Sequence, residues 1–237
     1  MKMMTVALLS LFLFSTGAQA RGRSGGGGTG ITGDGSIGIG LSFISPGQDD
    51  LNSVIDANNT SQSKSTDKLS SGYELHLDYQ TRFTGTIYAL QFRPTYFTQS
   101  SSGSGYDVKL TGYSFFPILR IYALENAFIH FFFQTGVGYG KLSGTMSGPP
   151  GSINWSGESF GLMGGIGAEF MMTADQAIVV EGNLRYMPIP RNIASSVNGA
   201  PTNFSRASAG YELETNFHDV QTSMSGFQGL IGYQLMF

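Results

Sequence analysis

The residues of this chain that could carry chemistry are mostly charged residues that alternate with apolar ones. Glu74, His76 and Asp78 occupy every second position between Tyr73 and Gln80, and the positions between them are apolar. Alternate side chains of an extended strand point to the same face, so this segment has one polar and one apolar face. Similar alternation recurs around other acidic, basic and histidine residues. The full set that we expect on one enclosed polar face is Glu74, His76, Asp78, Arg93, Arg120, His130, Glu169, Glu181 and Arg185.

Carboxylates and guanidinium groups that share an enclosed face form charge-assisted and often bidentate hydrogen bonds. An unpaired charge in a narrow interior would carry a large desolvation penalty. We therefore interpret these residues as a cross-linking network that closes the interior. A gated polar path for ions or small solutes is the alternative. Counting from the strand ends predicts one layer of Arg120, His130, Glu169 and Glu181, and a second layer of Arg93, Arg185 and Glu74.

A catalytic site would need a nucleophile, a base and an orienting acid close together. His218 is the one histidine in a long polar connection, where a lipid-modifying site is conceivable. The acidic and hydroxyl residues near it in the sequence are Glu212, Glu214, Asp219 and Ser223. A histidine among acids in a loop is more often a solvated side chain, and Glu74 and His76 lack a third ligand for a metal ion. We expect no enzymatic activity, no catalytic residues, no metal and no cofactor.

Eight segments have apolar residues at every second position, which indicates β-strands with one apolar face. In the segment 129–139, for example, Phe131 and Phe133 alternate with His130 and Gln134. The connections after the second, fourth and sixth segments are short, whereas 45–70, 99–105, 143–157 and 191–225 are longer and polar. Short turns on one side and long loops on the other are typical of outer-membrane barrels. The eight windows are 37–43, 73–80, 88–96, 113–122, 129–139, 160–170, 178–186 and 227–237.

These patterns predict an all-β fold, an eight-stranded antiparallel transmembrane up-and-down β-barrel. A soluble β-sandwich would alternate too, but its polar faces would carry many Lys and Glu residues, whereas these carry mainly Gly, Ser and Gln. An even strand number places both termini on the side of the short turns, the periplasm. Aromatic residues should form a belt near each rim. The outer belt is expected to contain Tyr73, Tyr96, Tyr139, Phe160, Tyr186 and Phe227, and the periplasmic belt Tyr79, Tyr88, Phe128, Phe170 and Phe237.

The composition agrees with a membrane-facing surface. Of 237 residues, 12% are charged and 34 are Gly, against about 25% charged residues and about 7% Gly in ordinary soluble domains. The aromatic share of 13% excludes a disordered polar chain. The absence of Cys excludes disulfide scaffolds and thiol catalysis. A formal net charge of -3 gives no basic footprint, so we expect no nucleic-acid partner.

The N-terminal segment has the form of an export signal. Residues 1–20 contain Lys2, then an apolar run, then the small-x-small ending Ala18-Gln19-Ala20, which together indicate a secretory signal peptide. The apolar run is too short to cross about 30 Å of hydrocarbon as a helix. The Gly-rich segment 21–35 is interpreted as a flexible leader. The barrel domain is then expected to span residues 36–237.

The C-terminal segment carries the most specific resemblance. Ile231, Tyr233, Leu235 and Phe237 alternate up to a terminal Phe, which resembles the signal recognised by the outer-membrane barrel assembly machinery. With eight strands, the chain resembles the small OmpA/OmpX-like outer-membrane β-barrel family. The resemblance implies a location in the outer membrane of a Gram-negative bacterium, with both termini periplasmic. It also implies partners: outer-membrane lipid and lipopolysaccharide, the barrel assembly machinery, and possible surface ligands of the long loops.

The long connections are the remaining candidates for function. The apolar spacing of Leu51, Val54 and Ile55 predicts a short helix in the first one. Exposed loops on a rigid scaffold commonly carry binding. We expect a non-enzymatic outer-membrane barrel that anchors such loops for envelope structure or surface interaction, its lumen closed by the charged network. A narrow channel for ions or small solutes is the alternative.

Overall fold

The computed structural model describes residues 35–149, 151–199, 204–215 and 218–237. All of them belong to one compact unit, residues 32–237. The predicted signal peptide 1–20 and, apart from Gly35, the predicted leader 21–35 lie outside the described residues.

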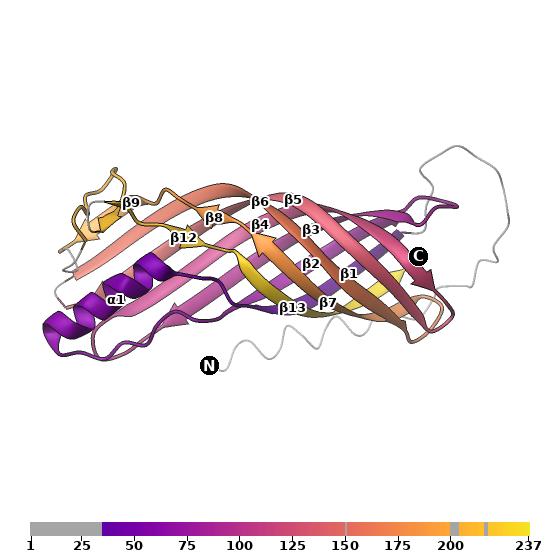
Figure 1. Cartoon of the computed structure of the whole chain (residues 1–237), viewed down its shortest axis with the longest axis horizontal. Helices are drawn as coiled ribbons and strands as arrows, with labels where there is room; N and C mark the ends of the chain where they lie inside the picture. The colour runs from indigo at the N-terminus through magenta and orange to yellow at the C-terminus, as the bar shows by residue number, and fades with distance from the viewer. Residues whose placement is uncertain (1–34, 150, 200–203, 216–217) are drawn as a thin grey trace. The chain divides into compact units, whose positions relative to one another are not determined.

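Eight long strands of the described chain form a closed antiparallel barrel (Figure 1). Each pairs with its neighbours in chain order, and the pairing of the first strand, β1, with the last, β13, closes the sheet. The predicted fold class is therefore confirmed. The barrel strands are β1 (Gly35–Ile44), β2 (Gly72–Arg82), β3 (Tyr88–Ser101), β4 (Asp107–Glu125), β5 (Ile129–Gly148), β6 (Gly151–Met171), β7 (Gln176–Tyr186) and β13 (Gly226–Met236).

The two ends of the barrel differ. Short turns join β2 to β3, β4 to β5 and β6 to β7 at the end where β1 begins and β13 finishes. There the backbone N–H of Phe237 donates to Gly35 O at 2.9 Å, and that of Gly35 donates to Phe237 O at 3.1 Å. We call this the turn end and the opposite end the helix end. The helix end carries α1 (Asp49–Gln62), β8 (Pro188–Ile189), β9 (Ile193–Asn198), β10 (Glu214–Thr215), β11 (His218–Asp219) and β12 (Thr222–Ser223).

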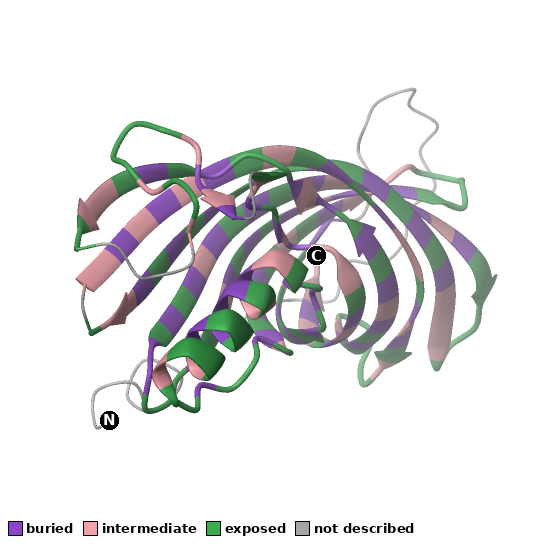
Figure 2. Ribbon diagram, turned by 60° about the vertical axis from the view of Figure 1, so that its left-hand side comes forward, coloured by how far each residue is buried: buried purple, intermediate pink, exposed green. Residues whose placement is uncertain are grey.

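Burial alternates along every barrel strand, as the banding of the ribbon in Figure 2 makes visible. In the half of the barrel nearer the turn end, the outward face is apolar: Phe133 and Val137 of β5 are 48% and 61% exposed. The inward positions between them include the buried Gln134. This half therefore has a polar interior and an apolar exterior, the reverse of a soluble protein.

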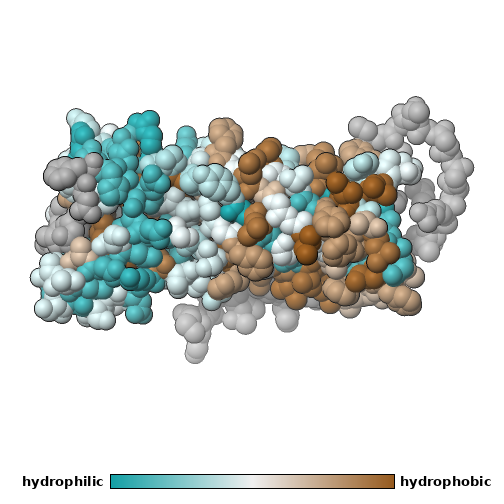
Figure 3. All heavy atoms as spheres, in the orientation of Figure 1, coloured by the Kyte–Doolittle hydropathy of each residue, from teal (hydrophilic) through white to brown (hydrophobic). Residues whose placement is uncertain are grey.

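Toward the helix end the polarity of the two faces is reversed, so that the outward face becomes polar and the inward face apolar. On β5 the outward positions become Lys141, Ser143 and Thr145, while Leu142 and Met146 are fully buried inside. Figure 3 shows the result on one face of the molecule: hydrophilic residues cover the helix end and hydrophobic residues the other half. The barrel wall thus has an apolar exterior over one part of its length only.

This exchange of faces accounts for one wrong expectation. We predicted a polar loop over 143–157, but β5 continues to Gly148 and β6 begins at Gly151. The two strands stay paired from Ile129↔Phe170 to Gly148↔Gly151. Polar residues at outward positions of a strand outside a membrane face water, so polarity there does not indicate a loop.

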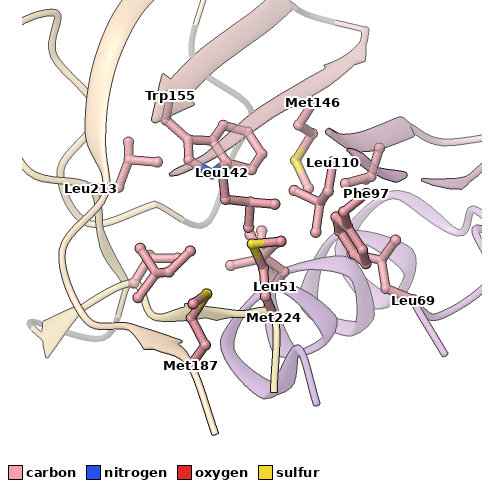
Figure 4. Packing of buried hydrophobic residues seen from close by; sticks show 14 of the residues in the cluster. Leu51, Leu69, Phe97, Leu110, Leu142, Met146, Trp155, Met187, Leu213 and Met224 are labelled. Carbon is pink, nitrogen blue, oxygen red and sulfur yellow. The ribbon is translucent and has the colours of Figure 1, made fainter. Parts of the chain in front are cut away.

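An apolar core fills the interior of the helix end (Figure 4). Trp155 of β6 is 1% exposed, and its ring lies so close to Gly144 of β5 that a Cβ there would approach it to 2.2 Å. The helix predicted around residues 51–55 forms, extends to Gln62, and turns Leu51, Val54 and Ile55 into this core. Further members are Leu69, Phe97, Leu110, Leu142, Met146, Met187, Leu213 and Met224.

Side-chain amides attach α1 to the rest of the helix end. Each amide bonds to both the N–H and the C=O of one residue, as a neighbouring strand would. Asn52 donates to Leu69 O at 3.0 Å and accepts its N–H at 2.8 Å. Asn59 makes the same two bonds to Thr66, both at 2.9 Å. Gln48, just before the helix, donates to the O of Ser223 at 2.7 Å and accepts its N–H at 3.1 Å. We call these three the amide clamps.

Candidate functional site

A salt bridge spans the full width of the lumen in the turn-end half of the barrel. Arg93 on β3 and Glu181 on β7 lie on strands that are four positions apart in either direction around the closed sheet. Their side chains form a bidentate pair, with both N···O distances 2.8 Å. The Arg93 Nε also donates to Asp78 at 2.7 Å. Fork-to-fork geometry of this kind is the strongest arrangement for an Arg–carboxylate pair.

Arg120 is the second guanidinium on the same acid. Its Nη2 donates to Glu181, and its Nη1 donates to Glu169 at 3.1 Å and to Gln80 at 2.9 Å. The remaining Nε donates to Gln134 at 3.1 Å. Arg120 is 1% exposed, so its charge is compensated by neighbouring side chains rather than by solvent.

The third guanidinium forms a separate pair nearer the helix end. Arg185 donates to Glu74 at 2.6 Å and to the backbone O of Met224 at 2.5 Å. Glu74 also accepts from Gln228, which accepts in turn from Asn183 at 3.1 Å. Because Asn183 also donates to Glu181 at 3.0 Å, the two ion-pair groups form one continuous network.

The predicted layers are partly different from the observed ones. Arg120, His130, Glu169 and Glu181 do lie together, and Arg185 with Glu74 lies apart from them. Arg93, however, bonds to Glu181 and Asp78 instead of to the Arg185 group. The long Arg side chain reaches beyond the level of its own Cα, which counting positions along a strand does not capture.

The two lumen histidines occupy different surroundings. His130 Nδ1 lies 3.3 Å from Glu169, and its side chain is 20% exposed. His76 is 1% exposed, and its Nδ1 lies 3.0 Å from Asp78. All nine residues of the predicted enclosed set are therefore in contacts within the lumen.

Neutral residues complete this network and were not among the predicted site residues. Gln80 donates to the Tyr122 hydroxyl at 2.8 Å, and that hydroxyl donates to Glu169 at 2.7 Å. The only sequence signal for these neutral residues was their position among the alternate residues that point into the barrel. Every barrel strand contributes to the network: Ser42, Glu74, Arg93, Arg120, Gln134, Glu169, Glu181 and Gln228, on β1 to β7 and β13 in that order.

Two of the three acidic residues predicted near His218 form ion pairs elsewhere. Glu212 bonds to Arg191, and Glu214 to Arg206, whereas His218 Nε2 lies 3.5 Å from Asp50 of α1. Among the described residues, no group of three His, Cys, Asp or Glu side chains could hold a metal ion. No helix in the described part of the chain combines the length and apolarity needed to cross a membrane.

The predicted assembly residues lie on β13 and at its end. Ile231 is 60% exposed and Phe237 is 73% exposed, whereas Tyr233 and Leu235 are half-buried. Their recognition by the assembly machinery stays a prediction.

Comparisons with known proteins agree at the level of the fold. No protein-family model matches the chain, and a search of curated proteins gives no match. The crystal structure of a major outer membrane protein from Thermus thermophilus is similar, with a TM-score of 0.55 and 11% identity over 87% of this chain and 100% of that one. OprG from Pseudomonas aeruginosa has a TM-score of 0.49 and 14% identity, over 86% and 96% of the two chains. Ail of Yersinia pestis has a TM-score of 0.44 and 16% identity, over 86% and 99%.

The closed barrel of the described residues and the first of these similarities lead to one assignment. The chain has the fold of the small eight-stranded outer-membrane β-barrels, the OmpA/OmpX-like class that its sequence resembles.

Proposed function

We propose that this protein is a non-conducting outer-membrane barrel that holds a rigid structured unit at the cell surface. The unit consists of α1, the described residues 188–199, 204–215 and 218–225, and the extended β4–β6 wall, and it serves envelope structure or surface interaction. One observation carries the proposal: the bidentate Arg93–Glu181 pair crosses the lumen beneath the apolar core of the helix end.

The membrane location is supported by the outward side chains. All the aromatic residues predicted for the two belts are exposed, from 38% for Tyr96 to 79% for Phe160. Rings also meet across strands in the belt nearer the helix end, with centroids 6.0 Å apart for Phe43 and Tyr73 and 5.4 Å apart for Tyr139 and Phe160. Aromatic girdles of this kind flank the apolar band of outer-membrane barrels.

The lengths of the connections at the two ends support an orientation in the membrane. Outer-membrane barrels have short periplasmic turns and longer extracellular loops. The turn end therefore faces the periplasm, with β1 starting and β13 ending there, and the helix end faces the outside.

A closed lumen is supported by two successive barriers. An ion entering from the turn end meets a network whose charges already bond to one another. Beyond that network it would have to enter the apolar core, where an ion without partners has a very unfavourable solvation energy. A channel would require both barriers to open together.

The surface unit is rigid because the amide clamps satisfy backbone groups that would otherwise need water. Asn52 and Asn59 each bind both the N–H and the C=O of one residue of the 63–71 segment. Buried hydrogen-bonding groups without partners cost about 1–3 kcal/mol each. We therefore regard α1 as a fixed part of the surface rather than a swinging lid.

Conductance in a planar bilayer tests the closed lumen. We expect no stable conductance steps from refolded wild-type protein, under conditions in which an open general porin conducts. Arg93→Gln combined with Glu181→Gln should also remain closed, because the apolar core lies above the altered network. Reproducible wild-type steps that change when Arg120 or Glu169 is replaced would overturn the proposal in favour of a channel.

The orientation has an independent test, since the chain contains no Cys. Ser53→Cys on the exposed face of α1 should react with a membrane-impermeant maleimide on intact cells. Ala174→Cys, in the turn after β6, should react only after the outer membrane is permeabilised. The opposite labelling pattern would reverse the assigned orientation.

A further inference from the structure

A groove of about 450 Å³ lies at the helix end, where three connections leave the barrel wall. The start of α1, the end of β7 and the 218–225 segment line it. Its volume lies within the range of about 300–1,000 Å³ that is common for small-molecule sites. None of its described lining residues belongs to the lumen network or to the apolar core, so closure of the barrel does not explain it.

Two of the serine hydroxyl groups in the lining accept backbone N–H groups, whereas the Thr222 hydroxyl donates to Asn192 at 3.1 Å. Ser223 Oγ accepts the N–H of Ser225 at 2.9 Å, and Ser225 Oγ accepts the N–H of Met187 at 2.7 Å. A hydroxyl that already accepts a hydrogen bond still has its own hydrogen to donate. The clamp from Gln48 to both backbone groups of Ser223 holds this side of the groove in place.

The opposite wall of the groove supplies acceptors. Asp49 and Asp50 are the first two residues of α1, and Asp50 is held by the backbone N–H of Gln221 at 2.8 Å. A carboxylate has room for several hydrogen bonds, so Asp50 can accept from a ligand as well. Residues with donor groups and residues with acceptor groups therefore line the same space.

The charges of the lining restrict what can bind. It contains the carboxylates of Asp49 and Asp50 and the imidazole of His218, but neither Lys nor Arg. Phosphate, sulfate and carboxylate groups would be repelled by the two acids. A ligand that is neutral or carries an amino group is not repelled by these carboxylates.

Tyr186 adds an apolar surface to this polar groove. Its side chain is 67% exposed, and the residue lies at the end of β7, among the aromatic residues of the belt nearer the helix end. A tyrosine ring offers a flat apolar face together with a polar tip. Sugar rings have apolar C–H faces that pack on such a ring, and their hydroxyl groups both donate and accept hydrogen bonds.

We infer that the groove between α1 and β12 binds a saccharide that is neutral or carries an amino group. The inference goes beyond the proposed function and rests on it only for the side of the membrane that the groove faces. In that orientation, the sugar of a glycolipid in the outer leaflet and a free saccharide outside the cell both reach the groove.

Saturation-transfer difference NMR tests the binding on the full refolded barrel domain. Dodecylphosphocholine is the appropriate detergent because its head group is not a sugar, and the probes are glucosamine, N,N′-diacetylchitobiose and maltose. We expect saturation transfer to at least one probe, and a loss of affinity of about tenfold or more in Tyr186→Ala and in Asp49→Asn. Tyr113→Ala is the matched control, because Tyr113 is also 67% exposed and packs on Tyr96 of the same belt with ring centroids 5.2 Å apart, but is not among the described lining residues.

Absence of transfer to all three probes, together with no Tyr186-dependent retention of a glycolipid in nanodiscs, would overturn the inference. Equal losses in Tyr186→Ala and Tyr113→Ala would overturn it as well. Lipid bilayer nanodiscs that contain a glycolipid with a neutral sugar head group distinguish the two sources. Retention of that glycolipid by wild type but not by Tyr186→Ala assigns the lipid-linked saccharide, whereas binding of free probes alone assigns the free one. The conductance result is independent of either outcome, so a failed inference and a failed proposed function are distinguishable.

Discussion

At the scale of single residues, Glu181 is the centre of the lumen. Its carboxylate accepts from Arg93, Arg120, Gln134 and Asn183, and the residue is 3% exposed. Replacing a whole buried ion pair by apolar groups is often neutral, whereas removing one partner leaves the other charge without compensation. Glu181 compensates two guanidinium groups, so its loss is the most damaging single change in the network.

Glu181→Gln should therefore lower the free energy of unfolding by about 3–5 kcal/mol, measured by urea unfolding of the barrel in lipid vesicles. Glu158→Gln is the matched control. It removes an exposed carboxylate that bonds to the Tyr139 hydroxyl at 2.5 Å, and exposed substitutions usually change stability by less than about 0.5 kcal/mol. Equal effects of the two substitutions would contradict a central role for Glu181.

At the scale of elements, α1 is attached by side chains that act in place of a neighbouring strand. Helix α1 has 14 residues, and the packing of its apolar face against the core is only part of its attachment. Asn52 and Asn59 are seven residues apart, two helical turns, so both point to the same side, where the 63–71 segment runs back toward β2. An amide side chain carries the same donor and acceptor as a peptide group, which is why it can pair with one.

Asn52→Ala combined with Asn59→Ala should expose the backbone amides of Leu69 and Thr66 to exchange. We expect their hydrogen-exchange protection to fall by roughly 1–3 kcal/mol, the range for a buried group that loses its partner. The control is Ser53→Ala combined with Thr60→Ala, which removes only bonds to the helix's own carbonyls. Unchanged protection at Leu69 and Thr66 in the Asn variant would mean that apolar packing alone fixes α1.

At the scale of the whole molecule, the sequence predicts the barrel well because each strand has a stretch in which apolar and polar residues alternate with a period of two. The exchange of faces toward the helix end conceals the full length of β5 and β6. The alternation also predicts the residues on the enclosed polar face, including Arg120 and Glu181. It does not predict the apolar core, because the members of that core come from segments far apart in the chain, as with Leu51, Trp155 and Met224. The groove beside Tyr186 depends likewise on how three separate connections pack. Local periodicity determines which face a side chain occupies, but not which remote segment meets it.

The predicted assembly role of Phe237 belongs to this scale as well, since it concerns the complete barrel. Phe237→Ser keeps the backbone bonds to Gly35 and removes only the ring. We expect most of the heat-modifiable, folded form in cell envelopes to be lost, as read from migration on detergent gels with and without heating. Phe128→Ser is the control, because Phe128 is 78% exposed and lies in a turn at the same end of the barrel. A normal folded yield for Phe237→Ser would exclude the ring as an assembly signal.

In the proposed membrane orientation, the exchange of faces along β5 and β6 also limits how deep the barrel sits in the bilayer. Successive outward residues of a strand are about 7 Å apart. A shift of one such step toward the periplasm would draw Lys141 to the edge of the hydrocarbon, where the cost of a Lys rises from about 0–1 kcal/mol near the interface toward about 2–4 kcal/mol at the midplane. A shift in the other direction would lift the rings of Tyr139 and Phe160 into water. In this orientation, the strands that form the wall therefore restrict movement of the barrel along the membrane normal. They keep α1 and the groove at a constant distance from the lipid.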